Sequence, residues 1–169
     1  AGGKLLFDSA RHEWLDFGGA RQEEAPPPGL FRTEIDLASG VVGHHRWHEK
    51  ATEFPRFDER RDGLPTRRVY SPTAHGPGAD RFNTLMATDT ETGAVTLCAF
   101  GPRDSVGEPV FAPRPGGTAE DDGWVMAFVH DDRSDDSHLA LWDARGIADG
   151  PVCRVTGCRG ACPRGCTGT

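Results

Sequence analysis

A short sequence frame recurs along the chain, and it limits the possible folds more than any other feature. The frame Asp-x-x-[Ser/Thr]-Gly-x-Val occurs as DLASGVV from Asp36 and as DTETGAV from Asp89, with a degenerate copy, DARG, from Asp143. Turn residues between apolar runs predict strand hairpins. A repeat of about 50 residues is typical of propeller blades with about four strands each. The chain would then hold about three blades.

Runs rich in apolar and β-branched residues flank these turns and predict an all-β chain. Residues 124–129, WVMAFV, are continuous enough for a buried strand and too few for an ordinary helix. Residues 64–81 instead resemble a long loop rich in Pro, Gly and Arg around Tyr70. The other expected strands are 4–7, 31–36, 41–47, 84–89 and 94–100.

Composition agrees with short strands and turns and excludes two classes of partner. The chain has 22 Gly and 13 Pro, and 36% of its residues are hydrophobic. Its net charge of −7 provides no basic surface, so we expect no nucleic-acid partner. No apolar run is long enough to span a bilayer, so we expect no transmembrane segment.

Histidines offer the most obvious candidate metal ligands. His44, His45 and His48 form an HHxxH pattern on an expected strand. Neighbouring side chains of a strand point to opposite faces, so His44 and His45 cannot both reach one ion without a bulge. We therefore interpret all three as solvated side chains. His130 and His138 flank the hairpin loop DDRSDD and are expected to be exposed.

A lone acid, Glu108, lies beside a proline where a strand meets a loop, in GEPVF. It is either a solvated strand-end glutamate or a buried carboxylate that orients another group. The surrounding stretch, GEPVFAPRPGGTAEDDGWVMAFVHD, resembles the C-terminal signature of the carotenoid cleavage oxygenases. The blocks EFPRFD from Glu53 and HLALWDA from His138 agree with that family in order and spacing, so the resemblance covers about residues 5 to 155.

This resemblance implies a fold and an activity. The family fold is a seven-bladed β-propeller with its active site on the axis, of which residues 1–155 would be the C-terminal part, an open arc with exposed sheet edges. The family's enzymes are non-haem iron dioxygenases. They cleave a conjugated alkene, in a carotenoid, apocarotenoid or stilbene, with O₂ into two carbonyls. The intact protein would then bind Fe²⁺, O₂ and a hydrophobic polyene or stilbene-like substrate, in the cytoplasm or at a membrane surface.

The resemblance also assigns roles to two residues. In the family four histidines hold the iron, and glutamates orient three of those histidines through their second ring nitrogen. Two of the glutamates correspond to Glu53 and Glu108. Of the histidine ligands, three are expected before Ala1 and one in a terminal motif, and none of the seven histidines of this chain has such a context. We therefore expect no catalytic residue, no metal ligand, no bound iron and no activity in this chain alone.

The tail, residues 156–169, allows more than one interpretation. Together with Cys153, the cysteines Cys158, Cys162 and Cys166 would suit a zinc or iron–sulfur site, but the spacing lacks C-x₂-C pairs. Written in GC-rich codons and read from the third base, GCRGACPRGC becomes LPRRVPAGLH, the family's terminal motif. We therefore predict that the tail is out of frame. Cys98, within an expected strand, is interpreted as a small buried hydrophobic residue.

Two other functions remain open. One is a binding module on a β-scaffold with a cysteine-rich metal-binding tail, and stoichiometric zinc in the purified chain would favour it. The other is a non-enzymatic propeller that serves only to bind a partner. A preceding sequence without the ligand histidines would favour that second alternative.

Overall fold

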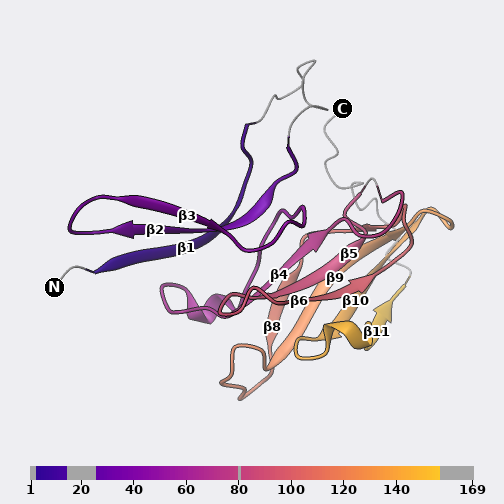
Figure 1. Ribbon diagram of the computed structural model, residues 1–169. Helices are drawn as coiled ribbons and strands as arrows, with labels where there is room; N and C mark the ends of the chain where they lie inside the picture. The colour runs from indigo at the N-terminus through magenta and orange to yellow at the C-terminus, as the bar shows by residue number, and fades with distance from the viewer. Residues whose placement is uncertain (1–2, 15–25, 80, 157–169) are drawn as a thin grey trace.

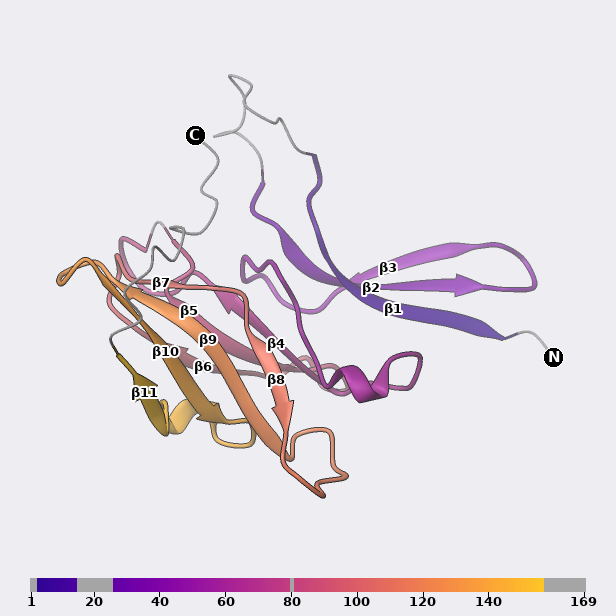
Figure 2. The same cartoon turned by 180° about the vertical axis from the view of Figure 1, so that it is seen from behind.

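The structure is a computed structural model that describes residues 3–14, 26–79 and 81–156. The described residues form three antiparallel sheets that do not close on one another, shown from two sides in Figures 1 and 2. Helix is limited in this part of the chain to two 3₁₀ turns, η2 (Glu59–Arg61) and η3 (Ile147–Asp149). The prediction of an all-β chain is confirmed.

The first sheet, here called the outlying sheet, projects away from the other two (Figures 1 and 2). It contains β1 (Lys4–Arg11), β2 (Gly29–Asp36) and β3 (Val42–Arg46) in that order. The predicted hairpin of residues 31–36 and 41–47 is confirmed as β2 and β3. Strand β1 extends well beyond the expected residues 4–7. Leu5, Leu6, Phe7 and Val42 are each about half exposed, whereas Leu30 and Thr33 of the same sheet are buried.

The central sheet contains β4 (Arg68–Thr73), β5 (Thr84–Asp89) and β6 (Val95–Ala99). The prediction of a loop over residues 64–81 is wrong, because β4 is a strand with five buried residues. Its Pro72 is tolerated because β4 pairs with β5 on one side and lies at the sheet edge. The predicted strand over residues 84–89 is confirmed as β5.

The C-terminal sheet is built around the long strand β9 (Gly123–Asp131). On one side β9 pairs with β10 (Asp136–Asp143), which pairs in turn with β11 (Cys153–Val155). On its other side lie the short strands β7 (Ser105–Val106) and β8 (Val110–Pro113). The three sheets therefore have three, three and five described strands, where about four each were expected.

The hydrophobic core lies between the central and C-terminal sheets. Strand β9 contributes alternate residues to it, so the predicted strand over residues 124–129 is confirmed but is buried on one face only. The Trp142 indole is fully buried and its Nε1 donates to Cys98 Sγ at 3.3 Å. Cys98 was predicted to be buried, but it is only partly buried and packs against the edge of the core. The fully or nearly fully buried members are Tyr70, Leu85, Val106, Val125, Ala127, Val129, Ala140, Trp142 and Ile147.

The repeated frame forms the same turn in two hairpins. Asp36 Oδ1 accepts from the backbone N–H of Ser39, and Asp89 Oδ1 accepts from that of Thr92. The glycine after each turn has a positive φ, 72° for Gly40 and 74° for Gly93, which an L side chain adopts only at a cost.

The third copy of the frame was assigned to the wrong residue. Asp143 leads into η3 and not into a hairpin. The equivalent turn joins β9 to β10, where Asp131 Oδ1 accepts from the N–H groups of Arg133 and Ser134. Asp135 takes the position of the glycine and has a φ of 51°. The sequence concealed this copy because an aspartate replaces the glycine that defines the frame.

The outlying sheet contacts the central sheet through the segment that follows β3. The Thr52 hydroxyl donates to the Pro72 carbonyl at 2.9 Å, and the Thr73 hydroxyl donates to the Ala51 carbonyl at 2.6 Å. His48 Nε2 lies 3.3 Å from Thr88 Oγ1. This segment carries the EFPRF motif, so the junction between the two sheets positions Glu53.

No helix of the described part has the length and apolarity that a membrane span requires.

Candidate functional site

Glu53 follows a fully buried residue, Thr52, which bridges to Thr73 on β4. Its Oε1 lies 2.7 Å from Nε2 of His12, the residue after β1. About a quarter of each of these two side chains is exposed. The carboxylate is therefore held close to an imidazole at the base of the outlying sheet. No sequence signal identified His12 as its partner, because the two belong to separate segments.

Backbone strain marks the residue that follows Glu53. Phe54 has a φ of 48°, an uncommon conformation for a bulky residue, and its ring is half exposed. Two residues later, Arg56 exchanges both backbone hydrogen bonds with Tyr70 of β4, at 2.8 and 2.7 Å. The strained residue thus lies between two segments, around Thr52 and Arg56, that are each fixed to β4.

Glu108 lies just before β8 and is about half exposed. The preceding Gly107 donates its N–H to the Phe128 carbonyl at 2.8 Å, which fixes this backbone against β9. Glu108 Oε1 lies 2.8 Å from Arg56 Nε, without the alignment of a hydrogen bond. The two motifs that were singled out from the sequence, EFPRF and GEPVF, are therefore brought together by an ion pair.

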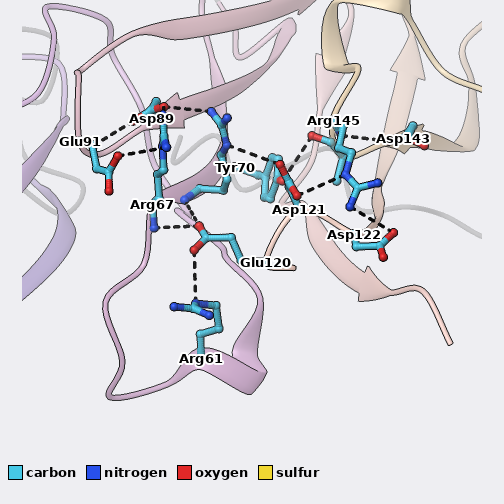
Figure 3. Close-up of polar contacts among 12 residues, drawn as sticks. Arg61, Arg67, Tyr70, Asp89, Glu91, Glu120, Asp121, Asp122, Asp143 and Arg145 are labelled. Carbon is cyan, nitrogen blue, oxygen red and sulfur yellow. Dashed lines mark hydrogen bonds and ion pairs between the residues drawn. The ribbon is translucent and has the colours of Figure 1, made fainter. Parts of the chain in front are cut away.

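Glu120, in the loop before β9, joins the C-terminal sheet to the central sheet (Figure 3). One of its oxygens accepts from the backbone N–H groups of Arg67 and Arg68 at the start of β4. Its other oxygen lies 3.3 Å from Arg61 Nε, and only 16% of its side chain is exposed. Charged residues flank it in the sequence EDDG, so a tertiary role was not apparent from the pattern.

Arginines at the start of β4 also control the ionisation of Asp89 (Figure 3). Arg67 Nη2 lies 2.8 Å and Arg68 Nη1 lies 3.3 Å from Asp89 Oδ2. The hydrogen bond from the Arg67 guanidinium lowers the pKa of Asp89 to about 2, against a partial opposing effect of burial. Burial raises the pKa of the Tyr70 hydroxyl, which donates to the Ala144 carbonyl at 3.4 Å.

Three of the histidine predictions are wrong in part. His44 and His45 are exposed and lie on opposite faces of β3, as expected, but His48 is partly buried against Thr88. Burial lowers the pKa of the His48 and His138 imidazoles. His130 is only 16% exposed, and its Nδ1 lies 3.3 Å from the Ser137 hydroxyl. A hairpin next to the core buries His130 and His138 more than their polar sequence context indicates.

Within residues 3–14, 26–79 and 81–156, no group of three or more His, Cys, Asp or Glu side chains is arranged to hold an ion. Cys158, Cys162 and Cys166 lie outside the described residues, and Cys153 is exposed at the start of β11. The described residues thus contain no preformed set of iron ligands.

Comparison with known proteins identifies the family. The family model described as "Retinal pigment epithelial membrane protein" matches residues 4–165. The chain is 34% identical over 153 residues to the apocarotenoid-15,15'-oxygenase of Synechocystis sp., covering 86% of this chain and 31% of that protein. It is 31% identical to lignostilbene-alpha,beta-dioxygenase isozyme III of Sphingomonas paucimobilis, covering 91% of this chain and 36% of that enzyme.

Solved structures agree with this result. Cobalt-substituted Synechocystis apocarotenoid oxygenase superimposes with a TM-score of 0.83 and 32% identity, over 92% of this chain and 34% of that one. The three sheets are thus an open part of a β-propeller, as predicted, and the chain spans about a third of the length of the relatives it matches. These observations establish that the chain belongs to the carotenoid cleavage oxygenase family.

Proposed function

We propose that this chain forms part of an iron-dependent dioxygenase that cleaves a conjugated carbon–carbon double bond with O₂. The substrate would be a carotenoid, apocarotenoid or stilbene, the classes for which its relatives are named. The contribution of this chain is a pair of carboxylates, Glu53 and Glu108, each of which orients the imidazole ring of an iron ligand.

The observation that carries this proposal is the position of Glu53. Its carboxylate lies 2.7 Å from an imidazole nitrogen, that of His12, so the site can hold a histidine ring by its N–H. The Arg56–Glu108 ion pair brings the second carboxylate to the same junction between sheets. A carboxylate that accepts from one ring nitrogen fixes the tautomer and raises the basicity of the other nitrogen. The proposal gives the described residues of this chain no role as histidine ligands of the iron.

The test uses the complete reading frame of the locus, expressed with Fe²⁺. We expect Glu53→Gln and Glu108→Gln each to lower iron affinity or turnover about 10- to 100-fold, because an amide orients an imidazole less well than a carboxylate. Glu49→Gln is the matched control, since Glu49 is 90% exposed, and it should have no effect. Glu120→Gln is unsuitable as a control because Glu120 anchors β4.

The same experiment separates the alternatives. If neither Glu53→Gln nor Glu108→Gln lowers iron affinity or turnover, the proposed role of the two carboxylates is contradicted. The family assignment stays intact in that case. Sequencing of the locus tests the prediction that residues 156–169 are out of frame. A metal bound through Cys158, Cys162 and Cys166, lost when all three are changed to Ser, would favour the cysteine-tailed module.

A further inference from the structure

His48 connects the outlying sheet to the central sheet. It lies in the segment that follows β3, and its Nε2 is 3.3 Å from Oγ1 of Thr88 in β5. Thr88 is fully buried, and it pairs with Val69 of β4. The imidazole therefore reaches from one sheet to a buried hydroxyl of the other.

The second ring nitrogen of His48 is buried without a partner. Its Nδ1 is shielded from solvent and has no hydrogen-bond partner among the described residues. A neutral ring tolerates this arrangement when Nε2–H donates to the Thr88 hydroxyl, because Nδ1 then carries a lone pair and no proton. Protonation would place an N–H and a positive charge at Nδ1, and a buried charged group that lacks a partner is costly. The contact therefore suits the neutral form of the imidazole.

The charged groups around His48 oppose its protonation. Arg46, whose Nε donates to the His48 carbonyl at 3.0 Å, and Lys50 both act on the ring as cations. Glu49 is 90% exposed and pairs with Arg46. On the central sheet the ring faces an uncharged hydroxyl, and the next carboxylate along β5, that of Asp89, pairs with two arginines. Burial is the main cause of the lowered pKa of His48, which the two cations lower further and the backbone groups of His48 and Lys50 partly restore.

A second imidazole near this junction has the opposite surroundings. His12 Nε2 lies 2.7 Å from the Glu53 carboxylate, so protonation of His12 gives it an ion pair. His48 has no such carboxylate beside it, and its protonation is opposed by burial and by two cations. Of these two imidazoles, His48 is therefore the one whose protonation weakens the contact between the sheets.

The chain after His48 is fixed to β4 close to the same contact. Arg56 exchanges both backbone hydrogen bonds with Tyr70, at 2.8 and 2.7 Å. Tyr70 follows Val69, the residue of β4 that pairs with Thr88. Loss of the His48 contact would therefore loosen the EFPRF motif, which lies on this segment.

We infer that His48 is a pH-sensitive latch, which holds the outlying sheet against the central sheet while its imidazole is neutral and releases the EFPRF segment when it is protonated. The closed junction buries the ring, whereas the open junction lets water solvate both nitrogens of the cation. Because protonation is resisted in the closed state alone, mild acid favours the open state. The latch does not depend on the proposed reaction, although its opening would also move Glu53.

Hydrogen exchange of the full 169-residue chain at pH 7.5 and pH 5.5 tests this inference. The N–H groups of Arg56 and Tyr70 report on the junction, and their protection factors correct for the pH dependence of chemical exchange. The ordinary pKa of the His48 imidazole is 6.5. Protection should therefore fall by up to about tenfold at pH 5.5, the limit for one proton one pH unit below that value. Low concentrations of urea should not change this exchange, because a local opening exposes little surface.

Two matched variants separate His48 from the other titrating groups. His48→Gln keeps an N–H donor for Thr88 but does not titrate, so Arg56 and Tyr70 should be equally protected at both pH values. His138→Gln makes the same change at another imidazole whose pKa is lowered by burial, on β10, and should retain the fall in protection. NMR titration of the His48 ring in the wild-type chain needs no substitution, and its midpoint should lie below 6.5.

Several results would overturn the inference. These are equal protection of the wild-type junction at both pH values, a fall that persists in His48→Gln or disappears in His138→Gln, and a His48 ring that titrates at or above its ordinary pKa. Urea that accelerates exchange of Arg56 and Tyr70 as strongly as that of β9 would also overturn it, because the whole chain would then unfold together. None of these results bears on the proposed orienting carboxylates, which are tested by iron affinity.

Discussion

The hairpin turns after Asp36 and Asp89 have the same sequence frame in very different surroundings. Both aspartates accept from the backbone of their own turn, and both turns end in a glycine with positive φ. Asp36 belongs to the outlying sheet and is partly exposed to solvent, whereas Asp89 is only 6% exposed and pairs with Arg67 and Arg68. The comparison shows that local sequence specifies the turn, while tertiary packing determines how much stability its residues contribute.

The largest expected effect tests the difference in packing. Leu85→Ala should destabilise the chain by about 3 kcal/mol, because Leu85 is fully buried in the central sheet. Leu37→Ala changes the same residue type in the turn of the outlying sheet, where 64% of the residue is exposed, and should cost about 0.5 kcal/mol or less. Urea unfolding followed by circular dichroism measures both. Equal costs would show that the outlying sheet is packed as tightly as the core.

The next effect separates the turn from its ion pairs. Asparagine keeps the side-chain oxygen that accepts from the turn but removes the charge. Asp89→Asn should therefore cost about 1 to 2 kcal/mol, since Arg67 and Arg68 each lose one of their acidic partners. Asp36→Asn should leave the unfolding midpoint within error. If both variants behaved alike, the contribution of the Asp89 ion pairs would be negligible.

The pH dependence of stability provides an independent measure of the same contrast. The pKa of Asp89 is about 2 in the folded chain and near the ordinary aspartate value of 3.8 when unfolded, so its contribution is present above pH 4. Stability should fall by about 1 to 2 kcal/mol as pH decreases from 4 to 2, because the unfolded state binds the proton first. Asp36, Asp58 and Asp131 also have lowered pKa values and act in the same direction. The difference between wild type and Asp89→Asn isolates Asp89, and parallel pH profiles would contradict this assignment.

The smallest effect concerns the third turn. Asp135 has a φ of 51° where Gly40 and Gly93 occupy the other two turns. Asp135→Gly should stabilise the chain by about 0.5 kcal/mol, because relief of the left-handed conformation is partly offset by greater freedom of the unfolded chain. A thermal melt of the variant beside Gly93→Ala, which should be destabilised, tests this. Destabilisation of both would mean that the contacts of the Asp135 side chain outweigh the strain.

The parts of the fold that were predictable are those encoded over a few residues. The turns at Asp36 and Asp89 and the strand at residues 84–89 follow from local frames. Strand β4 was missed because Arg67, Arg68 and Pro72 are poor strand signals, and their positions are stabilised by Asp89, Glu120 and a sheet edge. Tertiary contacts overrode local preference there.

The residues of the candidate site also fall into those that local sequence predicts and those that only tertiary contacts determine. Glu53 and Glu108 were identified from motifs, and their role as orienting carboxylates stays a prediction. Their partners in the structure, His12 and Arg56, are determined by how separate segments meet, which no local pattern encodes. The role of Glu120 leaves no sequence signal for a related reason: one of its oxygens accepts from backbone N–H groups, which every sequence offers alike.

The Asp-centred turns also have a consequence for protein engineering. Each of the three turns is closed by hydrogen bonds between the aspartate and residues two or three positions later, so its conformation is specified largely within the turn itself. We therefore expect the loop from Asp36 to Gly40 to form the same turn when it is transplanted between β9 and β10.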